Sequence, residues 1–273
     1  MIGLVVVAVL ALGAVVAAYA WFEAGWLRTR VLEVDVVGLP SELDGLRIGH
    51  LSDFHLGAVL SRGNGASERA AAWVAERAPD LVCITGDLVT RPRGEKRLRR
   101  ILALFEKPIV VLGNHDVAIT RDPFSRAAEL EDLRHAVLLR DSGVTRELRG
   151  RSVQLVGSDP AKHRERETTP WTLVDPDASL RILLCHYPSL TRRVPPGMFQ
   201  LALAGHLHAG QLCIPLGRRR RLTLAHPRAE LVSGVYPSPA GPLHISPGTG
   251  TTLVPFRLFA RPEVTELVLR RAE

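Results

Sequence analysis

The chain has 273 residues, of which 46% are hydrophobic and 23% are charged. This composition excludes an intrinsically disordered chain, and the length is enough for a sizeable core in one or two domains. The formal net charge of +7 favours anionic partners such as phosphate esters, nucleic acid or an anionic lipid surface. Cys83, Cys185 and Cys213 form neither a disulfide framework nor a Cys-x-x-Cys pair, so we interpret them as packing residues of a reducing compartment.

The first element in chain order is an apolar segment. No charged side chain occurs from Met1 to Phe22, and a bilayer core takes about 20 apolar residues to cross. Trp21 and Trp26 stand where an interfacial aromatic belt would be. We therefore predict a transmembrane anchor over residues 1–26 in the inner, cytoplasmic membrane.

Two features bear on the orientation and fate of this anchor. Arg28 and Arg30 follow it, so the positive-inside rule puts the rest of the chain on the cytoplasmic side. The alternative is a cleaved signal peptide ending at Ala18-Tyr19-Ala20, with a periplasmic or extracellular domain. A signal peptide carries basic residues before its apolar stretch, and this chain has none there.

Residues 27–45 are predicted to be a juxtamembrane linker with a first strand at 31–37, where apolar residues alternate with period two. Residues 46–273 are predicted to be one domain. Its first half alternates strands with helices, which is typical of a partly parallel sheet with helices outside it. Strands are expected at 46–51, 80–85 and 108–112, and helices at 66–78, 95–106 and 123–135.

The second half of the domain is predicted to consist mainly of strands, interrupted by a long loop at 158–177. The expected strands are 136–139, 144–148, 153–156, 181–185, 200–204, 211–215, 243–246 and 264–269. We therefore predict an α/β fold class in which a two-sheet β-sandwich is flanked by helices.

Five polar segments each follow an apolar run that predicts a buried strand. They are Asp53-Phe54-His55, Gly86-Asp87, Gly113-Asn114-His115-Asp116, Cys185-His186 and Gly205-His206-Leu207-His208. Strands of an α/β sheet present ligands at their carboxyl ends, and Asp, His and Asn suit divalent metals of mixed oxygen and nitrogen preference. A single such His or Asp is more often structural, but five segments together indicate a two-metal hydrolytic site.

Residue spacing gives two further expectations for this site. In extended backbone, residues two apart project to the same side, so Asp53 should converge with His55 and His206 with His208. Glycines at 86, 113, 205 and 210 are expected to let the backbone turn sharply beside the ions.

The ordered set of segments resembles the calcineurin-like metallophosphoesterase superfamily, over roughly residues 46–269. The forms Leu51-Ser-Asp-Phe-His-Leu-Gly57 and Gly205-His-Leu-His-Ala-Gly-Gln211 are similar to a membrane-associated bacterial subgroup. Some of its members are UDP-2,3-diacylglucosamine pyrophosphatases of lipid A synthesis, and others are exported phosphodiesterases.

The resemblance implies two divalent metal ions, for which manganese, zinc and iron all suit the ligands. It assigns the first ion to Asp53, His55 and His208, the second to Asn114, His186 and His206, and both to Asp87. It also implies that His115 contacts the phosphate and protonates the leaving oxygen, while Asp116 orients the His115 ring.

The resulting hypothesis is a membrane-anchored enzyme that hydrolyses a phosphodiester or pyrophosphate bond, with UDP-2,3-diacylglucosamine as the most specific substrate candidate. One alternative is an exported phosphodiesterase of broad specificity. Another, of a different class, is a non-catalytic metal-binding scaffold, against which the complete ligand set counts.

Two basic clusters extend the list of partners. We interpret the cluster of Arg91, Arg93, Lys96, Arg97, Arg99 and Arg100 as a solvated face. Arg218, Arg219, Arg220 and Arg221 lie closer to the metal segments, and we expect them to contact anionic lipid headgroups. Nucleic acid is disfavoured because aromatic residues make up only 5% and do not interleave with the arginines.

Overall fold

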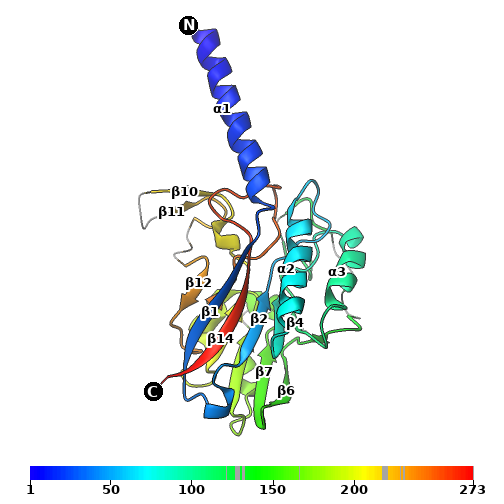
Figure 1. The fold of residues 1–273 in the computed structure, drawn as a ribbon, viewed down its shortest axis with the longest axis vertical. Coiled ribbons are helices and arrows are strands. Elements are labelled where there is room, and N and C mark those ends of the chain that lie inside the picture. Colours follow the sequence, from blue (N-terminus) through cyan, green and yellow to red (C-terminus); the bar gives the residue numbers. More distant parts are fainter. Residues whose placement is uncertain are drawn as a thin grey trace.

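The computed structural model describes residues 1–120, 122–126, 130, 133–165, 167–216, 221–227, 229 and 231–272, with the backbone alone at 164 and 221. Two six-stranded sheets form the body of the molecule (Figure 1). The first has the order β1-β14-β2-β3-β4-β5. Its strands are β1 (Arg28–Val37), β14 (Glu263–Ala272), β2 (Arg47–Leu51), β3 (Leu81–Thr85), β4 (Ile109–Val111) and β5 (Val137–Leu138).

The second sheet has the order β12-β13-β9-β8-β7-β6. Its strands are β12 (Gly234–Tyr236), β13 (Leu243–Ile245), β9 (Leu201–Ala204), β8 (Leu180–Leu184), β7 (Arg151–Gly157) and β6 (Ser142–Leu148). The inner faces of the two sheets share one core, in which Ile48 and Val111 of the first sheet pack with Leu155, Ile182 and Leu203 of the second. All five are fully buried, and each such side chain stabilises the fold by about 1.5–3 kcal/mol. The predicted two-sheet sandwich is confirmed.

Helices α2 (Gly63–Arg77) and α3 (Glu95–Leu102) cover the outer face of the first sheet. Val74 and Leu98 pack there against Leu51 and Ile84 of β2 and β3. This packing follows from the alternation β2-α2-β3-α3-β4, because each helix connects two parallel strands.

Shorter elements complete the described part of the chain. These are η1 (Ser41–Leu43), η2 (Pro92–Gly94), α4 (Pro160–Glu165), η3 (Pro170–Leu173), η4 (Pro188–Arg193), η5 (His208–Gly210) and a two-stranded ribbon of β10 (Cys213–Pro215) and β11 (Arg221–Thr223).

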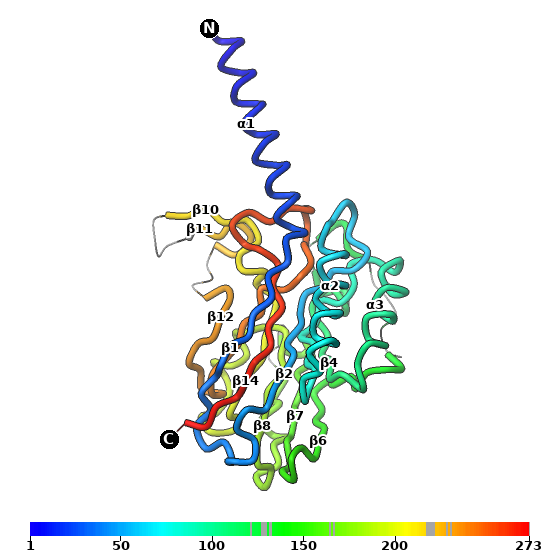
Figure 2. The backbone as a smooth tube through the Cα atoms, viewed as in Figure 1, coloured from blue at the N-terminus to red at the C-terminus, as the bar shows by residue number. Residues whose placement is uncertain are grey.

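The apolar helix α1 (Ile2–Glu23) projects from one end of the sandwich (Figure 2). It has a mean hydropathy of 2.7 over its most apolar window and is long enough to cross a membrane. Its last turn is docked on the domain, since the buried carboxylate of Glu23 accepts hydrogen bonds from the backbone N–H of Phe259 (3.0 Å) and Ala260 (2.7 Å). The docking fixes the direction in which the anchor leaves the domain.

Strand directions place the carboxyl ends of the central strands beside the anchor. Strand β1 starts at Arg28, a few residues after α1 ends, and runs parallel to β14. Strand β14 is antiparallel to β2, which is parallel to β3, and β3 is parallel to β4. The loops that follow β2, β3 and β4 therefore lie at the end of the sandwich from which α1 emerges.

Two sequence expectations about secondary structure are wrong. The helix expected at 123–135 is absent from the residues described there, which form turns and loop. The Asp122 carboxylate accepts the N–H of Phe124 (2.8 Å), and Arg126 N–H donates to the Thr90 carbonyl (2.8 Å), so these amides do not enter a helical ladder. The expected loop at 158–177 contains α4 and η3, and α4 starts where the Asp159 carboxylate accepts the N–H of Ala161 (2.8 Å).

The three cysteines are buried, as expected of packing residues. Burial raises the pKa of the Cys83 and Cys185 thiols to about 12, so neither is a thiolate near neutral pH.

The first basic cluster lies on the surface, where three of its arginines contact other residues of the chain. Arg97 pairs with Glu68 (2.9 Å), and Arg91 and Arg93 donate to the backbone carbonyls of Phe124 and Gly57. In the second cluster, Arg218, Arg219 and Arg220 lie outside the described residues, and the same holds for the side chain of Arg221.

Candidate metal centre

The candidate site lies in the loops that follow five strands. Strands β2, β3, β4, β8 and β9 end at Leu51, Thr85, Val111, Leu184 and Ala204, and each polar segment begins within two residues of its strand end. The two sheets thus bring distant segments to one point, since Asp53 and His208, which are 155 residues apart, belong to the same cluster.

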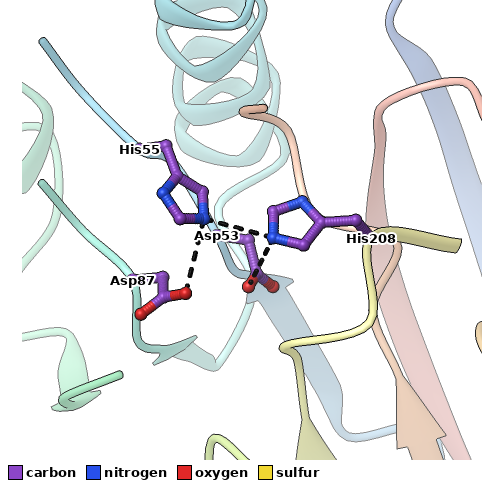
Figure 3. Close-up of side chains that lie close together, drawn as sticks. All are labelled: Asp53, His55, Asp87 and His208. Atoms are coloured by element: carbon purple, nitrogen blue, oxygen red, sulfur yellow. Dashed lines mark hydrogen bonds and ion pairs between the residues drawn. The ribbon is translucent and has the colours of Figure 1, made fainter. Parts of the chain in front are cut away.

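The first cluster consists of Asp53, His55, Asp87 and His208, all of them buried. Figure 3 shows the four side chains pointing toward one another. Nε2 of His55 lies 3.1 Å from Nε2 of His208 and 3.4 Å from Oδ2 of Asp87, and Nε2 of His208 lies 3.5 Å from Oδ1 of Asp53. One potential ligand atom from each of the four residues lies within 4.8 Å of the others.

The second cluster consists of Asp87, His186 and His206, and so shares Asp87 with the first. Nε2 of His186 lies 3.3 Å from Oδ2 of Asp87 and 3.2 Å from Nδ1 of His206. Asn114 joins this cluster, with its Oδ1 3.0 Å from the same His186 nitrogen. The structure therefore brings together all seven residues that the sequence pattern nominated as ligands.

The hydrogen bonds of His186 test whether the residues fit a metal ion. Its Nδ1–H donates to the buried carbonyl of Thr85 (2.8 Å), so Nε2 is the nitrogen whose lone pair takes up either a proton or a metal ion. That lone pair faces oxygen and nitrogen acceptors of Asp87, Asn114 and His206. Acceptors that converge on an acceptor need a cation among them, so the donor set fits a divalent metal.

The electrostatics of the centre favour positive charge at His186, whereas burial lowers the pKa of His206 and His208 well below the usual value. Burial alone would lower the pKa of His186, but the carboxylates of Asp87 and Asp53 raise it to about 9. Burial likewise opposes ionisation of Asp87, yet His186 and His115 hold the pKa of this carboxyl well below its usual range. Burial raises the pKa of Asp53. A cation at this point would replace the proton that His186 otherwise holds.

The backbone at the ligands does not have the extended conformation that their spacing predicted. Asp53 (φ 52°), His55 (φ 45°), His206 (φ 76°) and His208 (φ 49°) are in the left-handed region and not in extended conformation. Convergence of each pair through extended geometry is therefore wrong, because the strands end before these residues. Asp87 (φ 52°) has the same conformation, and non-glycine residues in it are typical of functional sites.

Two of the glycines permit close approach. A Cβ atom at Gly205 would lie 2.5 Å from Oδ2 of Asp53, and one at Gly113 would lie 2.7 Å from Cγ of Asp87. Neither has the positive φ expected of a sharp turn, whereas Gly86 (φ 88°) and Gly210 (φ 85°) do. At 113 and 205 the absence of a side chain leaves room for the two carboxylates.

His115 lies at the edge of the first cluster. Its ring contacts that of His55 edge-on, with 4.5 Å between centroids, and the backbone N–H of His115 donates to Oδ1 of Asp87 (2.9 Å). Burial lowers the pKa of the His115 ring to about 4, although the Asp87 charge opposes this. Hydroxyl groups of Ser125, Thr120 and Thr252 lie 3.2–3.3 Å from its ring nitrogens and fix its orientation.

Asp116 does not contact this ring through any of its described hydrogen bonds. Its carboxylate accepts backbone N–H groups of Leu88 (2.9 Å), Val89 (3.2 Å) and Gly113 (2.8 Å). Burial and the neighbouring Asp87 raise the pKa of Asp116 to about 7. Asp116 thus ties the loop after β3 to the loop after β4, which differs from the ring-orienting role that the resemblance implied.

Sequence reasoning missed Arg257, whose side chain is fully buried behind His208. Its guanidinium donates to the backbone carbonyls of His208 (3.3 Å), Pro247 (2.9 Å), Gly248 (3.1 Å), Gly250 (2.7 Å) and Ala260 (3.0 Å), and Nη2 lies 3.4 Å from Nδ1 of His208. Burial lowers the pKa of Arg257 to about 10, which still leaves it charged at neutral pH. No pattern around residue 257 indicates this role.

Comparison with protein families agrees with this geometry. The profile described as "Calcineurin-like phosphoesterase" matches residues 46–210, more than half of the chain. The chain belongs to this family. It is a phosphoesterase of the metal-dependent class, and the site described above lies almost wholly within the matched residues.

Relatives of this phosphoesterase share the domain. It is 26% identical over 239 residues to "Uncharacterized metallophosphoesterase YkoQ" of Bacillus subtilis, with 84% of each chain covered. It is 30% identical over 268 residues to a "Transmembrane protein with metallophosphoesterase domain" of Danio rerio, covering 88% of this chain and 57% of that one. Among solved structures, the NAD nucleotidase NadN of Haemophilus influenzae matches with a TM-score of 0.37 and 11% identity, over 76% of this chain and 48% of that one.

These findings establish a metal-dependent phosphoester hydrolase with an Asp/His cluster for divalent ions. The apolar helix α1, together with relatives named as transmembrane proteins, indicates a single-pass membrane protein.

Proposed function

We propose that this phosphoesterase hydrolyses a phosphodiester or pyrophosphate bond of a membrane-associated substrate, using two divalent ions. One observation carries the proposal: two ligand clusters share Asp87 at the end of the sandwich from which the anchor leaves. Asp53, His55 and His208 would hold one ion, and Asn114, His186 and His206 the other. Manganese, zinc and iron suit this ligand set.

The residues around the ions would divide the remaining work. When bound, two such ions neutralise phosphoryl oxygens and lower the pKa of water so that it attacks phosphorus near neutral pH. His115 borders the cluster and is oriented by three hydroxyls, so it would donate a hydrogen bond to the phosphate. The negative charge of a bound phosphate would raise the pKa of this buried ring, so that it would also give a proton to the leaving oxygen. Asp116 would hold the Asp87 and Asn114 loops in register.

A large pocket on the His206 side supports a substrate with a polar headgroup. The pocket measures about 840 Å³ and includes Tyr187, Arg192, His226 and Tyr236 in its lining. The Tyr187 ring lies 4.6 Å from that of His206, and the His226 ring 5.3 Å, so a group bound there would adjoin the metal cluster. Aromatic rings and an arginine suit a nucleotide, and UDP-2,3-diacylglucosamine is the most specific candidate.

We further place the catalytic domain on the cytoplasmic side of the inner membrane, with the anchor retained. The basic residues Arg28 and Arg30 directly after the apolar helix support this orientation. All three native cysteines are buried, so a Ser41→Cys variant offers one exposed thiol. A membrane-impermeant maleimide should leave it unlabelled in intact cells and label it after lysis, whereas labelling in intact cells would put the domain outside.

The substrate is tested with the full chain in detergent, loaded with manganese. Bis-p-nitrophenyl phosphate and UDP-2,3-diacylglucosamine are offered in parallel. We expect hydrolysis of both, with the higher kcat/KM for the lipid nucleotide. Turnover of the generic diester alone would discard that substrate and favour a phosphodiesterase of broad specificity. Turnover of neither, with two ions bound per chain, would overturn the enzymatic proposal in favour of a binding role.

A further inference from the structure

A second pocket adjoins the candidate metal centre on the side of the anchor. It measures about 310 Å³, and two loops, at residues 58–60 and 251–255, form two of its walls. The lining is mostly apolar: it consists of Ala58, Val59, Leu60, Thr90, Arg91, Asp122, Phe124, Thr251, Thr252, Leu253, Val254 and Pro255.

The inner end of this pocket reaches the candidate catalytic residues. The hydroxyl of Thr252 lies 3.3 Å from Nε2 of His115, and the hydroxyl of Thr90 lies 3.1 Å from Nδ1 of His55. A molecule lying in the pocket would therefore have its inner end beside His115 and the first metal cluster.

The outer end of the pocket is attached to the membrane helix. The indole N–H of Trp21, in the last turn of α1, donates to the carbonyl of Leu60 (2.9 Å). The N–H of Arg257, just beyond the other wall, donates to the carbonyl of Ala20 (3.0 Å). Figures 1 and 2 show the loop before α2 and the loop before β14 next to the lower end of α1. Both walls therefore lie where the helix would enter the bilayer.

Apolar side chains are exposed along this rim. Leu60 is 78% exposed and Leu253 is 52% exposed, and Val59, Phe124 and Val254 are also exposed. Leu60 (φ 55°) and Leu253 (φ 60°) have left-handed backbone, which is costly for a leucine and free of cost for a glycine. Large apolar side chains kept outward beside a membrane anchor are typical of a surface that contacts lipid.

We infer that this pocket binds the acyl chain of an amphiphilic phosphoester, which enters from the bilayer surface with its phosphate directed at the metal centre. The inference rests on the proposed phosphoesterase function and adds the substrate class and its orientation. The chain would lie between the Leu60 and Leu253 walls, and the polar headgroup would extend toward the pocket beside His206. Each methylene that the pocket buries should raise kcat/KM by about fourfold.

The test uses the full chain in phosphatidylcholine nanodiscs and a series of alkyl p-nitrophenyl phosphate diesters with methyl, butyl and octyl chains. We expect the octyl diester to exceed the methyl diester in kcat/KM by at least about 100-fold. Leu60→Glu and Leu253→Glu, one on each wall, should reduce that ratio to about 10-fold or less. Leu104→Glu, at an exposed leucine (50%) away from the pocket, should retain it. Equal melting temperatures would show that the variants are folded.

Two outcomes would overturn the acyl-chain site: an octyl-to-methyl ratio near one in the unaltered protein, or a high ratio that survives in both wall variants. A different result, no hydrolysis of even the methyl diester by the metal-loaded protein, would contradict the proposed function itself.

Discussion

Replacing Asp87 with asparagine is expected to abolish hydrolysis and to deplete both metal positions. The Asp87 carboxylate is the one group common to the two ligand clusters, and its Oδ2 lies 3.3–3.4 Å from His55 and His186. Asparagine keeps the shape but removes the charge that both ions would share. Metal ions stabilise phosphoryl transfer by several kcal/mol, so we expect a fall of about 10³-fold or more in kcat/KM for bis-p-nitrophenyl phosphate. Bound metal per chain should fall with it.

His115→Gln is the matched comparison for this experiment. His115 touches the same cluster, but its ring nitrogens face hydroxyl groups of Ser125, Thr120 and Thr252. We expect kcat to fall by about 10²-fold, as for other lost proton donors, while metal content stays near two ions per chain. Two retained ions in Asp87→Asn, or emptied sites in His115→Gln, would show that the roles are wrongly assigned.

Replacing Arg257 with methionine is expected to lower the free energy of unfolding more than Asp87→Asn or His115→Gln does. The change leaves the carbonyls of Pro247, Gly248, Gly250 and Ala260 without this donor in a buried environment. Each unpaired buried acceptor costs about 1–3 kcal/mol, and the structure relaxes in part, so we expect the free energy of unfolding to fall by about 3 kcal/mol or more. Denaturant titration of the detergent-solubilised chain measures it.

Arg257 also positions His208. The effect of Arg257 on metal affinity can be measured separately from its effect on the free energy of unfolding. Its guanidinium bonds to the His208 carbonyl and approaches Nδ1 of that ring, so its loss should weaken metal binding by about 10–100-fold. The control is Arg151→Met, which removes an exposed arginine paired with Glu42. In this variant the free energy of unfolding and the metal affinity should both stay near those of the unaltered chain. Unchanged metal affinity in Arg257→Met would limit Arg257 to a structural role.

The sequence predicted which candidate ligands lie together, but it did not predict their geometry. Each ligand follows an apolar strand, and parallel strands of one sheet end at one edge, so His55 was expected near Asp87 and His186 near His206. The packing of the two sheets brings these two pairs together. The left-handed backbone at Asp53, His55, His206 and His208 is set by tertiary contacts. One such contact is the Asp53 carboxylate, which accepts the N–H of His206 (3.0 Å). The role of Arg257 could not be predicted because its guanidinium binds backbone carbonyls, and no spacing of side chains indicates such contacts.

The bounds of the strands were predicted well from the pattern of apolar residues wherever a strand is buried on both faces. The core strands β3, β8 and β9 lie within one residue of their expected bounds, since long apolar runs leave little choice. Periodicity failed at 123–135, where the Asp122 side chain and the Thr90 carbonyl take up amides that a helix would need. Strand β14 is longer than expected because it pairs with β1 on one side and β2 on the other.

The most direct test is to strip the full chain of metal with a chelator and restore manganese stepwise. Bound ions per chain and the rate of bis-p-nitrophenyl phosphate hydrolysis are measured on the same samples. We expect no turnover without metal, and turnover that rises with the second ion bound, because both clusters share Asp87. Hydrolysis by the metal-free protein, or full activity with a single ion, would contradict a two-metal phosphoesterase centre.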